Sequence, residues 1–248
     1  GLKGAYENLD YLHSLGLTLT ITVLGTLFEL ISCSLVGYGF ARFEFPFKNA
    51  VFLLVVLTII VPPQTLLMSN YVHYRYFDFA GILKIFHTSL NLLDTPWVFV
   101  LPSIFASGLR GGLFIFIFRQ FFSDLPKELE EAAEIDGCGA FKTFRSIMVP
   151  MATSSYVTVL LFSVVWHWNE YYSSSAYFNG DIRPLSVKLL ALKDALEQSG
   201  LVANQNNLIV SRMYMMGGVL ITILPLLVLY VFTQRFFTES IEQTGIVG

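Results

Sequence analysis

The sequence predicts an all-α membrane protein, a bundle of helices that cross the lipid bilayer. Of its 248 residues 54% are hydrophobic and only 13% are charged, whereas a soluble domain carries about 25% charged residues. The apolar residues gather into long stretches, and polar and apolar residues do not alternate there as they do in membrane β-barrels. Each long stretch is therefore predicted to be a helix whose surface faces lipid.

Five stretches are long enough to cross the bilayer, since a hydrocarbon core of about 30 Å needs roughly 20 helical residues. They are 14–40, 50–68, 97–118, 148–168 and 213–233. Prolines and glycine pairs interrupt them, namely Pro62, Pro63, Pro102, Pro225, Gly111-Gly112 and Gly217-Gly218. Several of these helices should kink, with the freed backbone groups bonded by neighbouring helices.

The rest of the chain predicts one transmembrane domain over residues 1–248. No linker or low-complexity stretch divides it, and no basic run suggests a nucleic-acid partner. Cys33 lies in the first stretch and Cys138 in the loop before the fourth, so both are expected to be free thiols. The lysines and arginines outside the stretches divide seven to seven between the two sides. Those in the shorter loops count more, which favours a cytoplasmic location for 119–147.

The loop between the third and fourth stretches predicts two short helices. Pro126 and three glutamates form a helix start, with acidic groups near the positive end of the helix dipole. Gly137 ends this helix, residues 140–147 form a second one, and Pro150 opens the next span. On pattern alone the loop is either a solvated amphipathic connector or a docking surface. Ala132 and Ala133 would allow a partner to approach closely.

Two short strings and three single residues in this loop carry a family resemblance. They are Glu131-Ala132-Ala133, Asp136-Gly137 and, after nine intervening residues, Ile147, Val149 and Pro150. This spacing resembles the EAA motif of binding-protein-dependent ABC importer permeases, although the family usually has Leu where Val149 stands. The resemblance implies that a cytoplasmic loop, 123–148, couples to an ATPase through Glu131, Ala132, Ala133, Asp136 and Gly137.

Other strings are similar to the maltose-type, carbohydrate branch of that family. They lie at 37–43, 61–65, 118–122, 168–171 and 234–237, so the resemblance extends from about residue 14 to the C-terminus. It implies a type I ABC importer permease architecture, which usually has six spans, and hence one N-terminal helix beyond the five. The external segments 70–96 and 173–212 are longer than in the maltose-type pattern.

The resemblance also implies the partners. A second homologous permease subunit, two ATPase subunits and an extracytoplasmic binding protein are expected, in a bacterial inner membrane, with a sugar or oligosaccharide as cargo. ATP and Mg belong to the ATPase subunits, because this chain has no GxxxxGK[ST] phosphate loop. The chain itself is expected to be no enzyme and to hold no cofactor or metal.

Two other functions stay open. A permease for another solute, such as phosphate or an amino acid, would share the docking loop. An ion-coupled secondary transporter would need acidic residues at the middle of the membrane, where Glu29 is one candidate.

Glu29 and Arg110 are the formal charges inside the predicted spans. A charge in mid-bilayer costs roughly 2.5 to 3.5 kcal/mol, so each should face the protein interior. Their depths, about 20 Å and 14 Å at 1.5 Å per residue, allow an intramembrane ion pair. Alternatively, Arg110 lines the substrate path and pairs with a carboxylate of the cargo.

The substrate path is further predicted to involve the end of the fourth stretch, with Trp166, Trp168, Asn169 and Glu170. Aromatic rings stack on sugars, although an interfacial aromatic belt explains the same residues. Five basic side chains suggest an acidic, alginate-like oligosaccharide among the cargoes, namely Arg110, His167, His73, Arg75 and His87.

Overall fold

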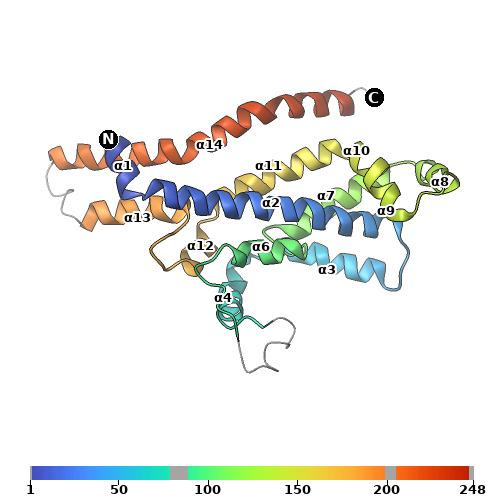
Figure 1. The fold of residues 1–248 in the computed structure, drawn as a ribbon, viewed down its shortest axis with the longest axis horizontal. Helices are drawn as coiled ribbons and strands as arrows, with labels where there is room; N and C mark the ends of the chain where they lie inside the picture. The colour runs from blue at the N-terminus through green and yellow to red at the C-terminus, as the bar shows by residue number, and fades with distance from the viewer. Residues whose placement is uncertain (1, 79–88, 199–204, 246–248) are drawn as a thin grey trace. The chain divides into compact units, whose positions relative to one another are not determined.

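The computed structural model describes residues 2–78, 89–198 and 205–245, and its regular elements there are helices (Figure 1). The elements are α1 (Leu2–Asn8), α2 (Tyr11–Arg42), α3 (Lys48–Ile60), the 3-10 helix η1 (Pro63–Leu66), α4 (Leu67–Arg75), α6 (Trp97–Ile104), α7 (Gly111–Asp124), α8 (Glu128–Ile135), α9 (Ala140–Thr143), the π-helix η2 (Phe144–Met148), α10 (Val149–Met151), α11 (Thr153–Asn169), α12 (Tyr172–Tyr177), α13 (Leu185–Gln198) and α14 (Gln205–Gly245). An isolated bridge joins Phe77 and Leu90. The all-α prediction is confirmed.

The predicted spans differ in how continuous they are. Stretches 14–40 and 213–233 lie in α2 and α14, which are long and apolar enough to cross a membrane. Stretches 50–68 and 148–168 each form a helix pair bent at a short break. Over the described residues, two helices therefore qualify as spans by length and composition, or up to four if each bent pair is one span.

The predicted kinks occur in the three middle stretches. The stretch 97–118 is divided into α6 and α7, with residues 105–110 between them. By contrast, Gly217, Gly218 and Pro225 lie inside an uninterrupted α14. These residues therefore do not break α14, in line with the general tolerance of membrane helices for glycine and proline.

The chain divides into two compact units. Unit 1 comprises Gly1–Leu24, Pro63–Phe99 and Val165–Phe232, and unit 2 comprises Gly25–Pro62, Val100–Val164 and Thr233–Gly248. That residues 1–248 act as one transmembrane domain stays a prediction.

Unit 1 has an aromatic core. Tyr74 and Tyr177 meet edge to face at 5.3 Å between ring centroids, and Phe99 stacks on Phe178 at 6.4 Å. Ile21, Leu93 and Val98 complete the buried cluster. Burial raises the pKa of Tyr177 above that of an exposed phenol, so this side chain stays neutral.

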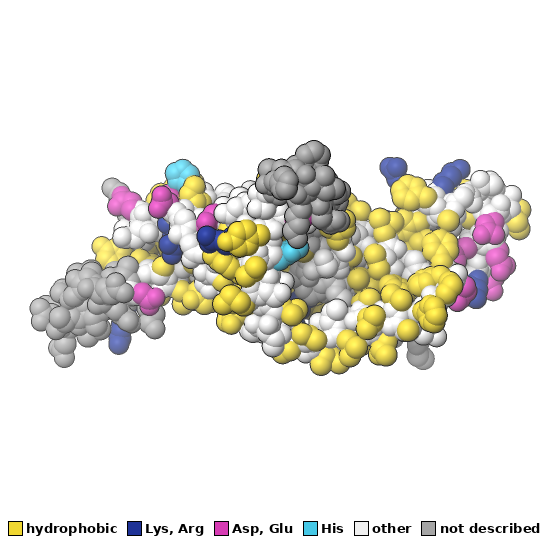
Figure 2. Space-filling model, turned by 90° about the horizontal axis from the view of Figure 1, so that it is seen from below, with side chains coloured by type: hydrophobic (Ala, Val, Ile, Leu, Met, Phe, Trp, Pro, Cys, Tyr) yellow, Lys and Arg dark blue, Asp and Glu magenta, His cyan; other side chains and the backbone are white. Residues whose placement is uncertain are grey.

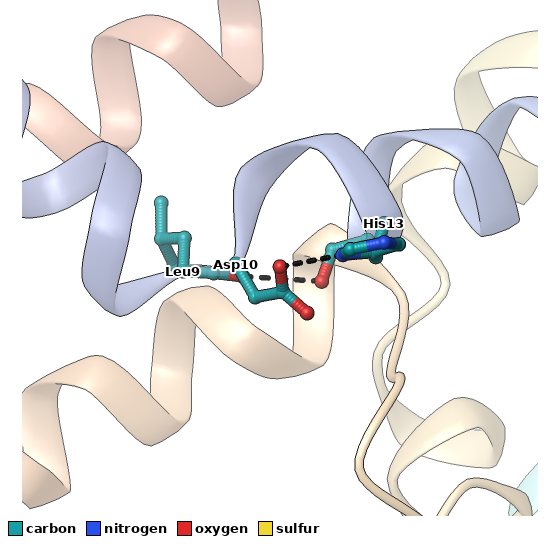
Figure 3. A network of polar contacts seen from close by, with 4 residues as sticks. Leu9, Asp10 and His13 are labelled. Atoms are coloured by element: carbon teal, nitrogen blue, oxygen red, sulfur yellow. Dashed lines mark hydrogen bonds and ion pairs between the residues drawn. The ribbon is translucent and has the colours of Figure 1, made fainter.

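The joint between α1 and α2 is held by side chains at the start of α2 (Figure 3). Asp10 has a φ of 45°, and its Oδ1 lies 2.8 Å from His13 Nδ1. Ser14 Oγ donates to the carbonyl of Leu9 at 3.1 Å. These contacts provide hydrogen-bond partners for polar groups at the end of α1 and the start of α2.

Asp94 joins two segments of unit 1 that are distant in sequence. Its Oδ1 accepts the backbone N–H groups of Asn179 and Gly180, both at 2.7 Å. Its own N–H donates to the carbonyl of Tyr177 at 3.0 Å. With a φ of 60°, this position favours Asp or Asn over most residues.

Replacing Asp94 with Ala is expected to lower the stability of unit 1 by roughly 1 to 3 kcal/mol, because two backbone donors lose their acceptor. Asp94→Asn keeps an oxygen at the same place and tolerates the positive φ, so its loss should be clearly smaller. Thermal unfolding in detergent compares the two variants. Equal melting temperatures for both variants would contradict the assigned role of Oδ1.

In unit 2, glycines allow neighbouring helices to pack closely against each other. A Cβ on Gly37 of α2 would stand 2.7 Å from the Cβ of Phe118, so α2 and α7 nearly touch there. A Cβ on Gly112 of α7 would stand 2.9 Å from the carbonyl oxygen of Val55 in α3. The Arg119 guanidinium lies 4.0 Å above the Phe52 ring, a cation–π contact between α7 and α3.

Large apolar side chains remain exposed along several helices, and hydrophobic side chains cover much of the face shown in Figure 2. On α2 the exposed members recur every four residues, at Leu19, Val23, Leu27, Ile31 and Leu35. This spacing places them on one face of the helix. Such a stripe would be unfavourable in water and suits lipid or another membrane helix.

Candidate functional site

The loop between α7 and α11 contains α8, the short helix that the sequence predicts to couple to an ATPase (Figure 1). Glu128, Glu130 and Glu131 occupy its first turn. At its end Gly137 has a φ of 74°. The Gly137 N–H donates to the carbonyl of Glu134 at 2.9 Å, and the Cys138 N–H to that of Ala133 at 2.8 Å. This is a Schellman motif, whose left-handed residue is usually glycine. The predicted acidic start and glycine stop are confirmed.

The second half of the loop is helical but less regular than predicted. The α-helical residues Ala140–Thr143 pass into a π-turn, Phe144–Met148, and then into Val149–Met151. Ala140–Met151 and α11 are bent by 78° relative to each other. The predicted fourth span, 148–168, is therefore bent near its start, and Pro150 precedes the long helix. Proline cannot donate a helical hydrogen bond, which accounts for the irregular turn beside it.

Most of the predicted coupling residues are exposed. Glu131, Ala132 and Asp136 are open to solvent, and so is Ile135, whose side chain is 87% exposed. Spacings of three and four residues place these four on one side of α8, and we call them the docking face. Gly137 is also exposed, whereas Ala133 is 4% exposed and packs inside the chain. The two alanines of the motif thus have different surroundings.

Sequence reasoning missed the residue that bonds α8 to the first span. Glu130 contacts Tyr38 and Arg42 in the last turns of α2. The three residues lie far apart in the chain, so no local pattern indicates that they meet. The sequence shows only the acidic first turn of α8, which the helix dipole explains equally well.

The break between α6 and α7 is bonded by α2. Ala106 and Arg110 have φ values of 56° and 64°, so the chain turns sharply there. Ser32 Oγ donates to the carbonyl of Ser103 at 2.7 Å, and Cys33 Sγ lies 3.7 Å from that of Gly111. Polar side chains of a neighbouring helix thus bond carbonyl groups at the interruption, as the sequence predicts.

Glu29 lies fully buried beside this break. Its Oε2 accepts a hydrogen bond from Ser163 Oγ at 2.7 Å, and Ser163 Oγ lies 2.9 Å from Thr26 Oγ1. A Cβ on Gly108 would stand 2.5 Å from Glu29 Oε1, so only glycine fits against the carboxylate. Arg110 is exposed at the start of α7. The Glu29–Arg110 ion pair stays a prediction.

The other residues predicted to line the substrate path lie at the end of α11 or directly after it. Trp168 is buried and its Nε1 donates to the carbonyl of Thr222 in α14 at 3.1 Å. Trp166 is half-buried and Asn169 is exposed. Glu170 Oε1 accepts the backbone N–H of Ser173 at 2.7 Å, which caps the start of α12. A substrate role for these four residues stays a prediction.

The basic residues suggested for an acidic cargo differ in their surroundings. His167 is 4% exposed, and its ring meets Phe99 edge to face at 6.4 Å. His73 and Arg75 are exposed on α4, and His87 lies outside the described residues. Cys33 and Cys138 are free thiols, as predicted. Among the residues that the structure describes, no group of three or more His, Cys, Asp or Glu could hold a metal ion.

Residues 33–240 match the family described as "Binding-protein-dependent transport system inner membrane component", and the chain belongs to this family. It is similar to the arabinooligosaccharides transport system permease protein AraQ of Halalkalibacterium halodurans, with 29% identity over 95% of this chain and 73% of AraQ. It is also similar to the polygalacturonan/rhamnogalacturonan permease protein YtcP of Bacillus subtilis, with 26% identity over 92% and 74%. The sn-glycerol-3-phosphate permease protein UgpE of Yersinia pestis is 27% identical over 93% and 71%.

The fold matches a solved bacterial ABC transporter involved in the import of the acidic polysaccharide alginate. The TM-score is 0.64 at 17% identity, over 94% of this chain and 79% of the solved chain. This likeness establishes the fold. The chain is thus a multi-pass inner-membrane permease subunit of an ABC importer, and its relatives are permease subunits rather than enzymes. It works with the other components of such a transport system.

Proposed function

We propose that this chain forms half of the translocation path of an ATP-driven importer for a sugar or oligosaccharide. The exposed docking face on α8, which ends at a left-handed glycine within the motif Glu131 to Gly137, carries this proposal. Ile135 is 87% exposed and places a large apolar side chain on this face, where a partner would cover it.

The proposed complex contains a second homologous permease subunit, two ATPase subunits and an extracytoplasmic binding protein. The loop 123–148 faces the cytoplasm, where its docking face lies against an ATPase subunit. ATP and Mg bind in that partner. When the ATPase subunits close on ATP, α8 moves with them as a rigid body and tilts the helices on either side of the loop, α7 and α11.

The cargo class is inferred from the relatives. AraQ and YtcP are named for oligosaccharides and pectic polysaccharides, and UgpE for a small phosphorylated polyol. Two of these three cargoes are anionic, as is alginate. We therefore propose a sugar or oligosaccharide as cargo and include uronate-type oligosaccharides among the candidates. A small phosphorylated polyol is the second candidate. Membership of a binding-protein-dependent family leaves no support for an ion-coupled secondary transporter.

The test is to purify the chain with its co-purifying partners and reconstitute the complex in proteoliposomes. ATP hydrolysis is then measured with pairs of candidate binding proteins and cargoes, which include a neutral oligosaccharide, a uronate oligosaccharide and glycerol 3-phosphate. Stimulation by one pair identifies the cargo class. If no ATPase subunit co-purifies with the chain, the proposal is contradicted.

An Arg110→Gln variant distinguishes the two roles considered for Arg110. If Arg110 pairs with an anionic cargo, the variant should assemble normally and lose uptake of that cargo by about ten-fold or more, since a charge-assisted hydrogen bond contributes roughly 1.5 to 3 kcal/mol. Uptake of a neutral cargo serves as the control. Arginine and glutamine both have a Cβ, so the backbone strain at the φ of 64° is the same in wild type and variant. Loss of assembly would instead support the structural ion pair.

A further inference from the structure

The docking helix cannot fix its own position. It has eight residues, of which Ala133 alone is buried, and isolated helices shorter than about 12–15 residues are marginal in water. The chain enters α8 from Leu125, whose backbone is extended, and leaves it through Gly137, whose backbone is left-handed. Contacts with other parts of unit 2 must therefore determine where the docking face points.

Glu130 makes contacts of this kind with both carboxylate oxygens. Oε1 accepts a hydrogen bond from the Tyr38 hydroxyl at 2.7 Å, and Oε2 lies 3.3 Å from Arg42 Nε. Arg42 Nη2 also donates to the carbonyl of Leu125 at 2.7 Å. The last turns of α2 are thus bonded both to α8 and to the segment that leads into it.

The pair is sheltered from water. The side chain of Arg42 is 5% exposed and that of Glu130 is 19% exposed. Exposed ion pairs contribute little to stability, whereas a sheltered pair with further hydrogen bonds is screened less and is costly to break from one side. Glu128 lies on the same helix and is exposed, which makes it a matched comparison.

Tyr38 extends the connection to both flanks of the loop. Its ring lies edge to face with Phe122 of α7 at 5.6 Å and 5.0 Å from the ring of Phe144 in the π-turn. Phe122 and Phe144 also meet at 6.0 Å. One tyrosine therefore packs against both flanks of the loop while its hydroxyl bonds α8.

We propose that Glu130, with Tyr38 and Arg42, is a positioning residue of the importer, one that fastens the docking helix to the end of α2. This inference rests on the proposed function of the loop. Movement that the ATPase imposes on α8 then reaches α2 directly, besides α7 and α11, which flank the loop. The adjacent Glu131 remains on the docking face and is free to meet the partner.

The first experiment needs no partner. Hydrogen exchange of the amides of residues 128–138 is measured in the full detergent-solubilised chain for wild type, Glu130→Ala and Glu128→Ala. Glu130→Ala should exchange about ten-fold faster, since hydrogen bonds to charged groups shift an opening equilibrium by roughly that factor or more. Glu128→Ala should match wild type. Unchanged exchange in Glu130→Ala would overturn the proposal.

The second experiment measures coupling in the reconstituted complex. Glu130→Ala should retain the ATPase subunits on purification but transport at least about five-fold less solute per ATP hydrolysed, the lower end of typical coupling effects. Tyr38→Phe should give part of this loss in wild type and no further loss in Glu130→Ala, because both remove the same bond. Glu130→Gln keeps an acceptor for Tyr38 and should lie between wild type and Glu130→Ala.

The outcomes separate the two proposals. A wild-type complex without ATPase subunits contradicts the proposed function, whatever the variants do. A wild-type complex that couples normally, beside a Glu130→Ala complex with the same transport per ATP, overturns the positioning role alone. So does loss of the ATPase subunits from Glu130→Ala, because the residue would then act in docking.

Discussion

A Gly137→Val variant is expected to lose at least about ten-fold in transport while the membrane helices remain folded. Gly137 has a φ of 74° and open space around its Cα, so the penalty comes from the backbone and not from a clash. The left-handed conformation costs a residue with a Cβ roughly 1 to 2 kcal/mol, and β-branched residues more. The chain would avoid this cost by breaking the Schellman bonds and turning the docking face away.

Gly139→Val is the matched control. Gly139 also has open space around it, but its φ of −75° and ψ of 163° are extended values that a β-branched residue adopts readily. Uptake by cells or proteoliposomes should stay close to wild type in this variant, at equal protein levels on an immunoblot. Similar losses in both variants would show that any added bulk harms the loop, which would contradict the conformational explanation.

Glu29→Ala is expected to be the most destabilising single change in unit 2, at roughly 2 to 5 kcal/mol. It removes the acceptor of Ser163 Oγ and leaves a cavity against Gly108 and Ser103, at the site where α2 supports the break between α6 and α7. The thermal midpoint in detergent, followed by size-exclusion chromatography, should fall accordingly. Transport should fall with the amount of folded protein.

Glu29→Gln separates shape and hydrogen bonding from charge. The amide has nearly the same volume and keeps an oxygen that accepts from Ser163 Oγ. If packing and the hydrogen bond dominate, this variant should retain most of the thermal stability that Glu29→Ala loses. A drop as large as that of Glu29→Ala would show that the negative charge itself is required, as the predicted ion pair with Arg110 implies.

The local features of the docking loop could be predicted because they depend on neighbouring residues. Glutamates in a first turn and a glycine in the left-handed region act within a few positions, so the helix from Glu128 and its stop at Gly137 were visible in the sequence. Apolar length likewise predicted the spans in α2 and α14. The sharp bend near the start of the fourth stretch was not predicted, because apolar length does not reveal the angle between two helices.

The long-range contacts could not be predicted. Glu130 is 92 residues from Tyr38, and Trp168 is 54 residues from Thr222, whose carbonyl its indole N–H meets. Such pairings depend on how the helices pack, and the spacing of apolar residues along the sequence does not indicate them. Trp168 illustrates the result, since the pattern indicated an interfacial or sugar-stacking ring and the structure shows a buried one bonded to α14.

The interrupted third stretch has a consequence for how this protein is made. Its first helix has eight residues and its second has 14, and Ser32 and Cys33 of α2 contact carbonyl groups of Ser103 and Gly111, on either side of the turn. An interrupted helix leaves backbone groups without partners inside the helix, and in a bilayer each group that stays unbonded costs several kcal/mol. We expect an isolated peptide of residues 97–124 to insert poorly. The ribosome delivers α2 first, so the earlier helix is already present to receive the later one.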